Sequence, residues 1–158
     1  MGVAGCGKTT VGRRLAAELG WAFFDADDFH PPENVARMAA GIPLTDEARL
    51  PWLRCLHDLL REQVRRGEPA VLACSALKRA YRDILQAENP GVRFVYLKAS
   101  PALIRERLLL RAGHFMKTEM LDSQFRALEE PEDALTVAAA GDPAEIITEI
   151  QRMLDLHS

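Results

Sequence analysis

The sequence predicts an α/β fold with one parallel sheet and helices on both faces. Short apolar runs alternate with amphipathic helical segments along the whole chain, which is the order expected of parallel strands joined by right-handed helical crossovers. The 158 residues amount to about one domain, and the 48% apolar and 27% charged residues are typical of a water-soluble globule with a buried core. A glycine-rich motif directly before the first helical segment is a third indication. We therefore expect a single domain over residues 1–158.

Helices are predicted where apolar residues recur every three or four positions and where glycine, or proline near the start, marks an end. Val11, Leu15 and Leu19 show this spacing before Gly20. Ser100 is expected to cap a later helix that Pro101 opens, since proline lacks the N–H that the first turn leaves unpaired. In chain order the predicted helices are 8–19, 34–40, 46–66, 78–88, 100–113 and 142–154, with partial helix over 114–130.

Strands are predicted where short apolar runs stand between these helices. Runs without polar alternation are typical of parallel strands that are covered on both faces. The second of these runs, Ala70-Val71-Leu72-Ala73-Cys74, is apolar throughout. In chain order the predicted strands are 21–24, 70–74, 92–97 and a weaker one at 135–139.

Charge and cysteine usage exclude several classes of protein. The net charge of -3 provides no positive field for nucleic acid or an acidic membrane. The three cysteines are odd in number and widely spaced, which argues against a disulfide framework or a zinc site. No apolar run approaches the ~18 residues of a membrane span. We expect a cytoplasmic protein with neither nucleic-acid nor membrane partners.

The run Gly2-Val3-Ala4-Gly5-Cys6-Gly7-Lys8-Thr9 matches G-x-x-x-x-G-K-[ST], the phosphate-binding P-loop. In such a loop backbone N–H groups and the helix N-terminus surround the β-phosphate, the lysine reaches the β and γ oxygens, and the hydroxyl group ligates Mg²⁺. The sequence therefore predicts ATP and Mg²⁺ as ligands. The residues expected to bind the nucleotide are Gly2, Gly5, Cys6, Gly7, Lys8, Thr9 and Thr10.

The remaining motifs favour a small-molecule kinase over other P-loop proteins. A GTPase would need Asn-Lys-x-Asp and Asp-x-x-Gly, and neither string occurs in the chain. Motor and transporter ATPases need a longer chain and an acidic residue at the end of a later strand. The acids that do end a strand are Asp25 and Asp27, at the sheet edge where ligands of open α/β sheets bind.

Four further blocks resemble the signature blocks of small P-loop gluconokinases, which are relatives of shikimate kinases. They cover nearly the whole chain in the family's order: 25–31, 41–53, 74–83, and 113–117 with 123–125. The resemblance implies a three-layer P-loop kinase sandwich, an acceptor-binding segment at about 30–66 and a lid at about 105–130. It further implies a homodimer and transfer of the ATP γ-phosphate to the 6-hydroxyl of D-gluconate.

A sugar acid also suits the charged residues, because its hydroxyls need carboxylates and its acid group needs cations. Asp27 is predicted to orient the attacking hydroxyl and accept its proton, whereas similarity to shikimate kinases implies that Asp25 holds Mg²⁺ through water. The alternative is that this acidic cluster is only a solvated strand exit. The other predicted acceptor-binding residues are Arg49, Ser75, Lys78, Arg82, His114 and Lys117.

Arg107 and Arg111 lie four residues apart on one helix face that leads into the polar segment. In related kinases such arginines sit in a lid and neutralise the transferring phosphoryl group. The resemblance therefore implies a catalytic role for this pair. The alternative for each of these cations is an ordinary solvated side chain.

Two other functions remain open from the sequence. The acceptor could be another small hydroxylated acid such as shikimate, although shikimate kinases would show a glycine triplet where this chain has Cys74-Ser75-Ala76. The chain could also be a non-catalytic ATP-binding module, because Met1 stands where an apolar strand should precede the P-loop. We expect Met1 to be an internal methionine or a boundary, and residues 1–158 to fold poorly alone. We expect them to form four parallel strands with an uncovered gap beside the P-loop.

Overall fold

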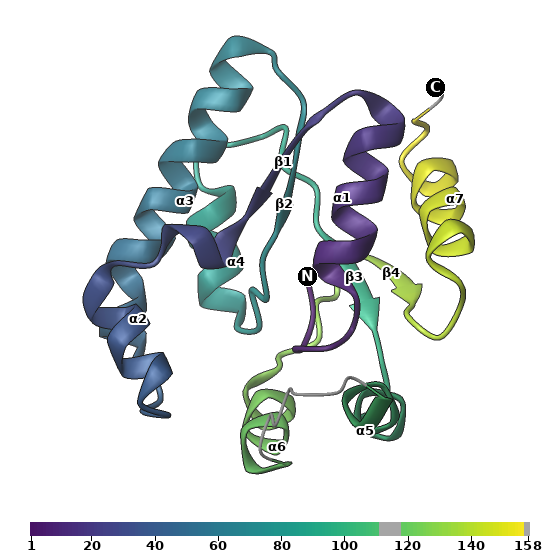
Figure 1. The fold of residues 1–158 in the computed structure, drawn as a ribbon. Coiled ribbons are helices and arrows are strands. Elements are labelled where there is room, and N and C mark those ends of the chain that lie inside the picture. The colour runs from purple at the N-terminus through teal and green to yellow at the C-terminus, as the bar shows by residue number, and fades with distance from the viewer. Residues whose placement is uncertain (111–117, 157–158) are drawn as a thin grey trace.

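The structure, a computed structural model, describes residues 1–110 and 118–156 and consists of short strands flanked by helices (Figure 1). A single 3-10 turn, η1 (Ala26–Phe29), follows the first strand. The strands are β1 (Ala22–Asp25), β2 (Ala70–Ala73), β3 (Val95–Lys98) and β4 (Leu135–Ala138). The α-helices are α1 (Lys8–Leu19), α2 (Pro32–Ala39), α3 (Asp46–Arg66), α4 (Arg79–Gln86), α5 (Pro101–Leu110), α6 (Thr118–Ala127) and α7 (Pro143–Met153).

Local signals account for the ends of the two helices whose predicted bounds are confirmed, α1 and α3. Gly20 and Gly67 end them in the left-handed region, with φ of 67° in both, a conformation that glycine adopts without a steric cost. At the start of α3 the Thr45 hydroxyl accepts the Ala48 N–H at 3.1 Å, as an N-cap does.

Other predicted bounds differ from the structure by a few residues. Helix α2 begins at Pro32, earlier than predicted, because proline suits the first turn. Strand β3 begins at Val95 and not at Val92, whose N–H instead donates to the Asn89 carbonyl in a turn. The Ser100 cap is confirmed, since its hydroxyl accepts the Leu103 N–H at 3.2 Å.

The described strands are all parallel and form two pairs. Strand β1 pairs with β2, and β3 pairs with β4. Between the pairs run Met1 and Gly2: the Met1 carbonyl accepts the Leu97 N–H at 3.0 Å, and the Gly2 N–H donates to the Ser75 carbonyl at 3.1 Å. The described residues thus form the four parallel strands that we expected, with a gap beside the P-loop.

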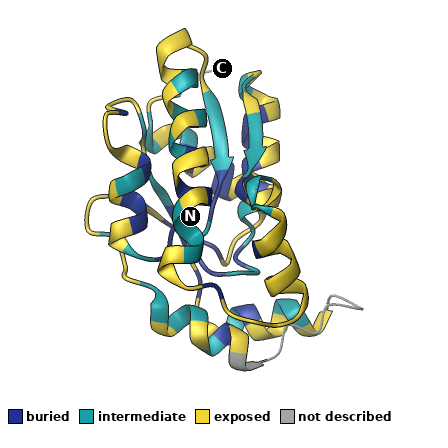
Figure 2. Cartoon of the chain, turned by 90° about the vertical axis from the view of Figure 1, so that its left-hand side faces the viewer, coloured by how far each residue is buried: buried dark blue, intermediate teal, exposed yellow. Residues whose placement is uncertain are grey.

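The gap is a cavity of about 710 Å³ between β2 and β3. Apolar side chains of both strands, of α1 and of α3 line it, among them Val11, Leu60, Val71 and Val95. Figure 2 accordingly shows strand residues largely in the teal of intermediate burial, and most residues of β1 and β2 fall in that class.

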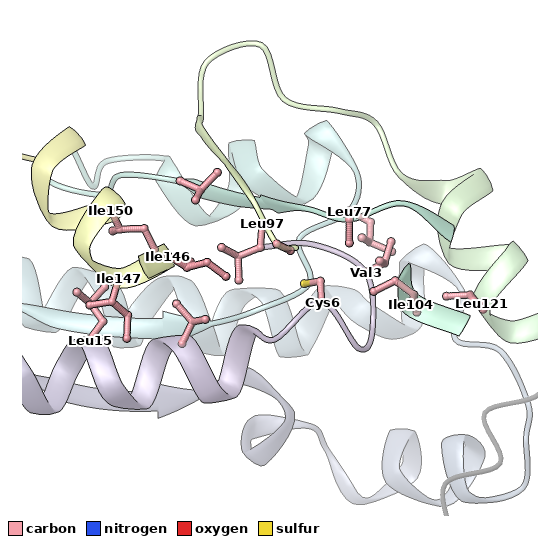
Figure 3. Packing of buried hydrophobic residues seen from close by; sticks show 14 residues of the cluster. Val3, Cys6, Leu15, Leu77, Leu97, Ile104, Leu121, Ile146, Ile147 and Ile150 are labelled. Atoms are coloured by element: carbon pink, nitrogen blue, oxygen red, sulfur yellow. The ribbon is translucent and has the colours of Figure 1, made fainter. Parts of the chain in front are cut away.

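The main hydrophobic core joins the P-loop to the C-terminal half of the chain. Helices α1 and α7 lie together on one side of the strands, and α3 and α4 pack on the other (Figure 1). Figure 3 shows Val3 and Cys6 of the P-loop in one cluster with Leu97 and Ile104. The loop is therefore part of the core and not a surface connection. No helix in the described part of the chain is long and apolar enough to cross a membrane.

We predict that eight alternating Val and Ile residues joined directly before Met1 raise the melting temperature by at least about 10 °C, and raise activity. Burying three aliphatic side chains in the cavity contributes about 5 to 9 kcal/mol before the cost of ordering the added residues. About 1 kcal/mol shifts the melting temperature of a chain of this size by ~2 to 4 °C. Thermal unfolding followed by circular dichroism measures the change. A control extension of eight alternating Ser and Gly residues should leave it unchanged, and equal melting temperatures for both extensions would contradict the prediction.

Candidate active site

The P-loop backbone has the shape that its glycines permit. Gly2 has φ of 142°, and a Cβ atom there would lie 2.9 Å from both the Cys6 Sγ and the Leu97 carbonyl oxygen. Gly7 has φ of 103° directly before α1. Side chains at either position would be strained, so glycine is required for the loop to turn into the helix N-terminus.

Lys8 folds back across the loop that it follows. Its ammonium group donates to the Gly2 and Val3 carbonyls, each at 3.0 Å. Because both carbonyls belong to the loop, the charge is held over the place where the loop would receive phosphate.

Thr9 and Asp25 meet at the carboxyl end of β1. The Thr9 hydroxyl donates to Asp25 Oδ2 at 2.9 Å, and Asp25 Oδ1 accepts the Asp27 N–H at 3.1 Å. The carboxylate of Asp27 follows in η1 and is exposed. These hard oxygen donors fit Mg²⁺, which binds through one or two protein oxygens and completes its shell with phosphate and water. Within residues 1–110 and 118–156 no group of three or more His, Cys, Asp or Glu is arranged to hold a metal ion.

Side chains from two distant helices also hold the P-loop. Arg107 of α5 donates from Nη1 to the Cys6 carbonyl at 3.3 Å and from Nη2 to the Ala139 carbonyl. Gln124 of α6 accepts the Ala4 N–H through Oε1 at 2.7 Å. Sequence reasoning assigned no role to Gln124, because a glutamine on a polar helix carries no local signal beyond its place in the fourth resemblance block.

A second cavity, of about 300 Å³, is lined in part by the P-loop. Arg107 and the segment that follows β4 form its walls. Its lining residues include Gly5, Gly7, Thr10, Arg107, Gly141 and Pro143. The cavity adjoins the phosphate-binding loop.

The predicted acceptor-binding cations Arg49 and Lys78 meet around Tyr81. The Lys78 ammonium contacts both carboxylate oxygens of Asp46 at 2.9 Å, and the Tyr81 hydroxyl also donates to that carboxylate. The Arg49 guanidinium lies 5.9 Å from the centre of the Tyr81 ring. The Tyr81 and Lys78 hydrogen bonds lower the pKa of Asp46, and the same contact with Asp46 raises the pKa of Lys78. Both groups are therefore charged at neutral pH. Sequence reasoning missed Asp46, which lies in the helix α3 far from Lys78 in the chain.

The structure contradicts an acceptor-binding role for Arg82. Its side chain is buried, and its guanidinium donates to the carbonyls of Ala76, Leu77 and Glu129. Lys78 precedes α4 as its N-cap, so the two cations do not share a helix face as expected. Arg82 instead fixes the loop after β2 against the segment after α6.

The structure brings Ser75 to the P-loop, where its carbonyl accepts the Gly2 N–H. Arg111, His114 and Lys117 lie outside the described residues.

The P-loop carries a paired threonine and carboxylate, and two cations predicted to bind an acceptor meet around Tyr81. This combination defines a phosphotransferase of small molecules. The sequence profile described as shikimate kinase matches residues 4–155. The chain belongs to this family.

Several relatives of this chain carry the name gluconokinase. A probable gluconokinase of Mus musculus is 51% identical over 148 residues, which are 83% of this chain and 80% of the relative. The gluconokinase of Gluconobacter oxydans is 46% identical over 155 residues, 96% of this chain and 87% of the relative. A gluconokinase structure from Sinorhizobium meliloti superposes with a TM-score of 0.88 at 42% identity and covers 98% of this chain and 89% of that one.

We predict that Arg107→Ala lowers kcat about 100-fold while the KM for ATP rises less than fivefold. The guanidinium lies against the P-loop, and a charge placed near the transferring group counts most in the transition state. Steady-state kinetics with varied ATP measures both constants. Arg105→Ala is the matched control, since Arg105 of the same helix pairs with Asp122 at 3.2 Å, and it should change neither constant. Equal losses in nucleotide binding and turnover for Arg107→Ala would instead indicate a static ATP clamp.

Proposed function

We propose that this chain is a gluconokinase that transfers the γ-phosphate of ATP to the 6-hydroxyl of D-gluconate, giving 6-phospho-D-gluconate and ADP. The observation that carries the proposal is the charge arrangement next to the P-loop. The carboxylates Asp25 and Asp27 end β1, and the cations Arg49 and Lys78 meet around Tyr81. An acceptor with hydroxyls and one carboxylate uses both kinds of group. The gluconokinase names of relatives 46–51% identical support the same acceptor.

The P-loop residues prepare ATP for transfer. Loop N–H groups and the N-terminus of α1 bind the phosphates, and Lys8 leaves its carbonyl partners for the β and γ oxygens. Thr9, through its hydroxyl, and Asp25, through water, would hold Mg²⁺, and the bound cation would neutralise charge on the phosphates. Arg107, with Arg111 as a predicted partner, adds positive charge near the γ-phosphate.

Asp27 positions the acceptor for an in-line displacement. The gluconate 6-oxygen forms a bond to the γ-phosphorus as the bond from that phosphorus to the bridging β–γ oxygen breaks. The hydroxyl proton passes to the Asp27 carboxylate and then to solvent. Little base strength is needed, because phosphoryl transfer depends mainly on position and charge neutralisation.

The acceptor carboxylate is proposed to bind between Arg49 and Lys78. The Lys78 ammonium group is already paired with Asp46, so the substrate carboxylate would share that ammonium group with Asp46. The Arg49 guanidinium would supply the second positive charge. Ser75, His114 and Lys117 stay predictions for the same region. We also propose a cytoplasmic homodimer; the three free cysteines fit a reducing compartment.

A panel of acceptors tests the function. ADP release is coupled to NADH oxidation with MgATP and gluconate, shikimate or no acceptor. We expect turnover with gluconate at least about 100-fold above that with shikimate. A preference for shikimate would reassign the acceptor, and ATP binding without turnover on any acceptor would indicate a non-catalytic module.

We predict that Asp27→Asn lowers kcat at least about 100-fold with little change in the KM for ATP. The amide keeps the size of the side chain but cannot accept the hydroxyl proton. Asp28→Asn is the matched control, because Asp28 is the exposed neighbour to which we assign no role, and it should retain full activity. A normal kcat with weakened Mg²⁺ dependence would show that the roles of Asp25 and Asp27 are exchanged.

A further inference from the structure

His30 lies at the acceptor side of the site and has no role in the mechanism above. It follows η1 directly, and its imidazole stacks on the Trp52 ring with centroids 4.2 Å apart and planes 14° apart. The Trp52 indole in turn donates to the Ala26 carbonyl at 2.7 Å and is buried in the core. The imidazole therefore rests on a rigid aromatic platform, and its plane is set before any ligand binds.

The surroundings of His30 favour the neutral form of its imidazole. Burial is the largest influence and lowers the pKa of His30, Asp27 raises it, and Arg49 lowers it further. Asp27 and Arg49 are the residues that we assign to the reacting hydroxyl and to the acceptor carboxylate. The geometry agrees, because Asp27 lies in η1, which His30 follows, and Arg49 lies one turn before Trp52 in α3, on which the ring stacks.

The hydrogen bonding of the ring indicates which of its nitrogens can donate to a ligand. Nδ1 is buried and has no hydrogen-bond partner within the described residues. A buried polar atom without a partner needs an explanation, and a buried N–H without a partner is rarer than an unpartnered acceptor. The lower-cost tautomer thus leaves Nδ1 unprotonated and places the proton on Nε2. In that tautomer Nε2 carries the N–H donor, at the end of the η1 turn that also carries Asp27.

A hydroxyl group is the ligand that matches a donor beside a carboxylate acceptor, because it accepts one hydrogen bond and donates another. A carboxylate or phosphate would be repelled by Asp27. We propose that His30 positions the acceptor by donating a hydrogen bond from Nε2 to a hydroxyl of the bound sugar acid. The proposal rests on the proposed gluconokinase function and adds a specificity-determining residue to it.

The test compares His30→Phe with His30→Gln. Phenylalanine keeps a flat ring on Trp52 but has no N–H, whereas glutamine keeps an N–H donor at nearly the same distance from the backbone. For His30→Phe we expect the KM for gluconate to rise about five- to tenfold, the loss of one net hydrogen bond. The KM for ATP should stay within twofold and the melting temperature within about 2 °C. His30→Gln should restore the gluconate KM to within about threefold of the wild type.

Monodeoxy analogues of gluconate identify the hydroxyl concerned. In the wild-type protein one analogue should lose five- to tenfold in kcat/KM through this contact, and the loss should vanish in His30→Phe. The proposal is overturned if His30→Phe leaves the gluconate KM unchanged, if it raises the gluconate and ATP KM values equally, or if every analogue keeps its wild-type ratio. Failure of the wild-type protein to phosphorylate gluconate overturns the proposed function instead, and the same variants are then compared with the acceptor that the panel identifies.

Discussion

The anchoring of the P-loop backbone is the constraint on which the rest of this structure depends. Met1 and Gly2 are hydrogen-bonded to β3 and to the segment after β2, and the side chains of Gln124 and Arg107 bind the loop from α6 and α5. The loop also contributes Val3 and Cys6 to the main core. A phosphate site built in this way is preorganised, because the N–H groups that receive the anion have little freedom left to lose.

The same anchoring connects the nucleotide and acceptor sides of the molecule. Through Ser75 the loop is joined to the turn that leads to Lys78, and through Thr9 and Asp25 it is joined to the end of β1. The acceptor side adds its own cluster, in which Asp46 balances Lys78 and leaves Arg49 over the Tyr81 ring. Balancing one cation limits the repulsion between the two positive charges and keeps both near the place proposed for an acidic substrate.

Local signals explain why much of the fold was predictable. The ends of α1 and α3 follow from glycine and threonine caps whose geometry needs only neighbouring residues. The four strands were recognised as apolar runs, although their exact ends depend on turns such as the one at Asn89. The described strands are parallel, as expected, and the cavity between β2 and β3 separates them into two pairs.

The sequence alone determined the class of the protein and the core of its nucleotide site, since the P-loop residues are adjacent in the chain and each has a separate chemical reason to be there. Only the tertiary structure decided which distant cations are free to act. The Arg82 guanidinium is hydrogen-bonded to three carbonyls. Lys78 is paired with Asp46, which is 32 positions away, and the His30 ring stacks on Trp52. The physical reason is that the availability of a charged or polar side chain depends on what surrounds it, and residues far apart in the chain supply those surroundings.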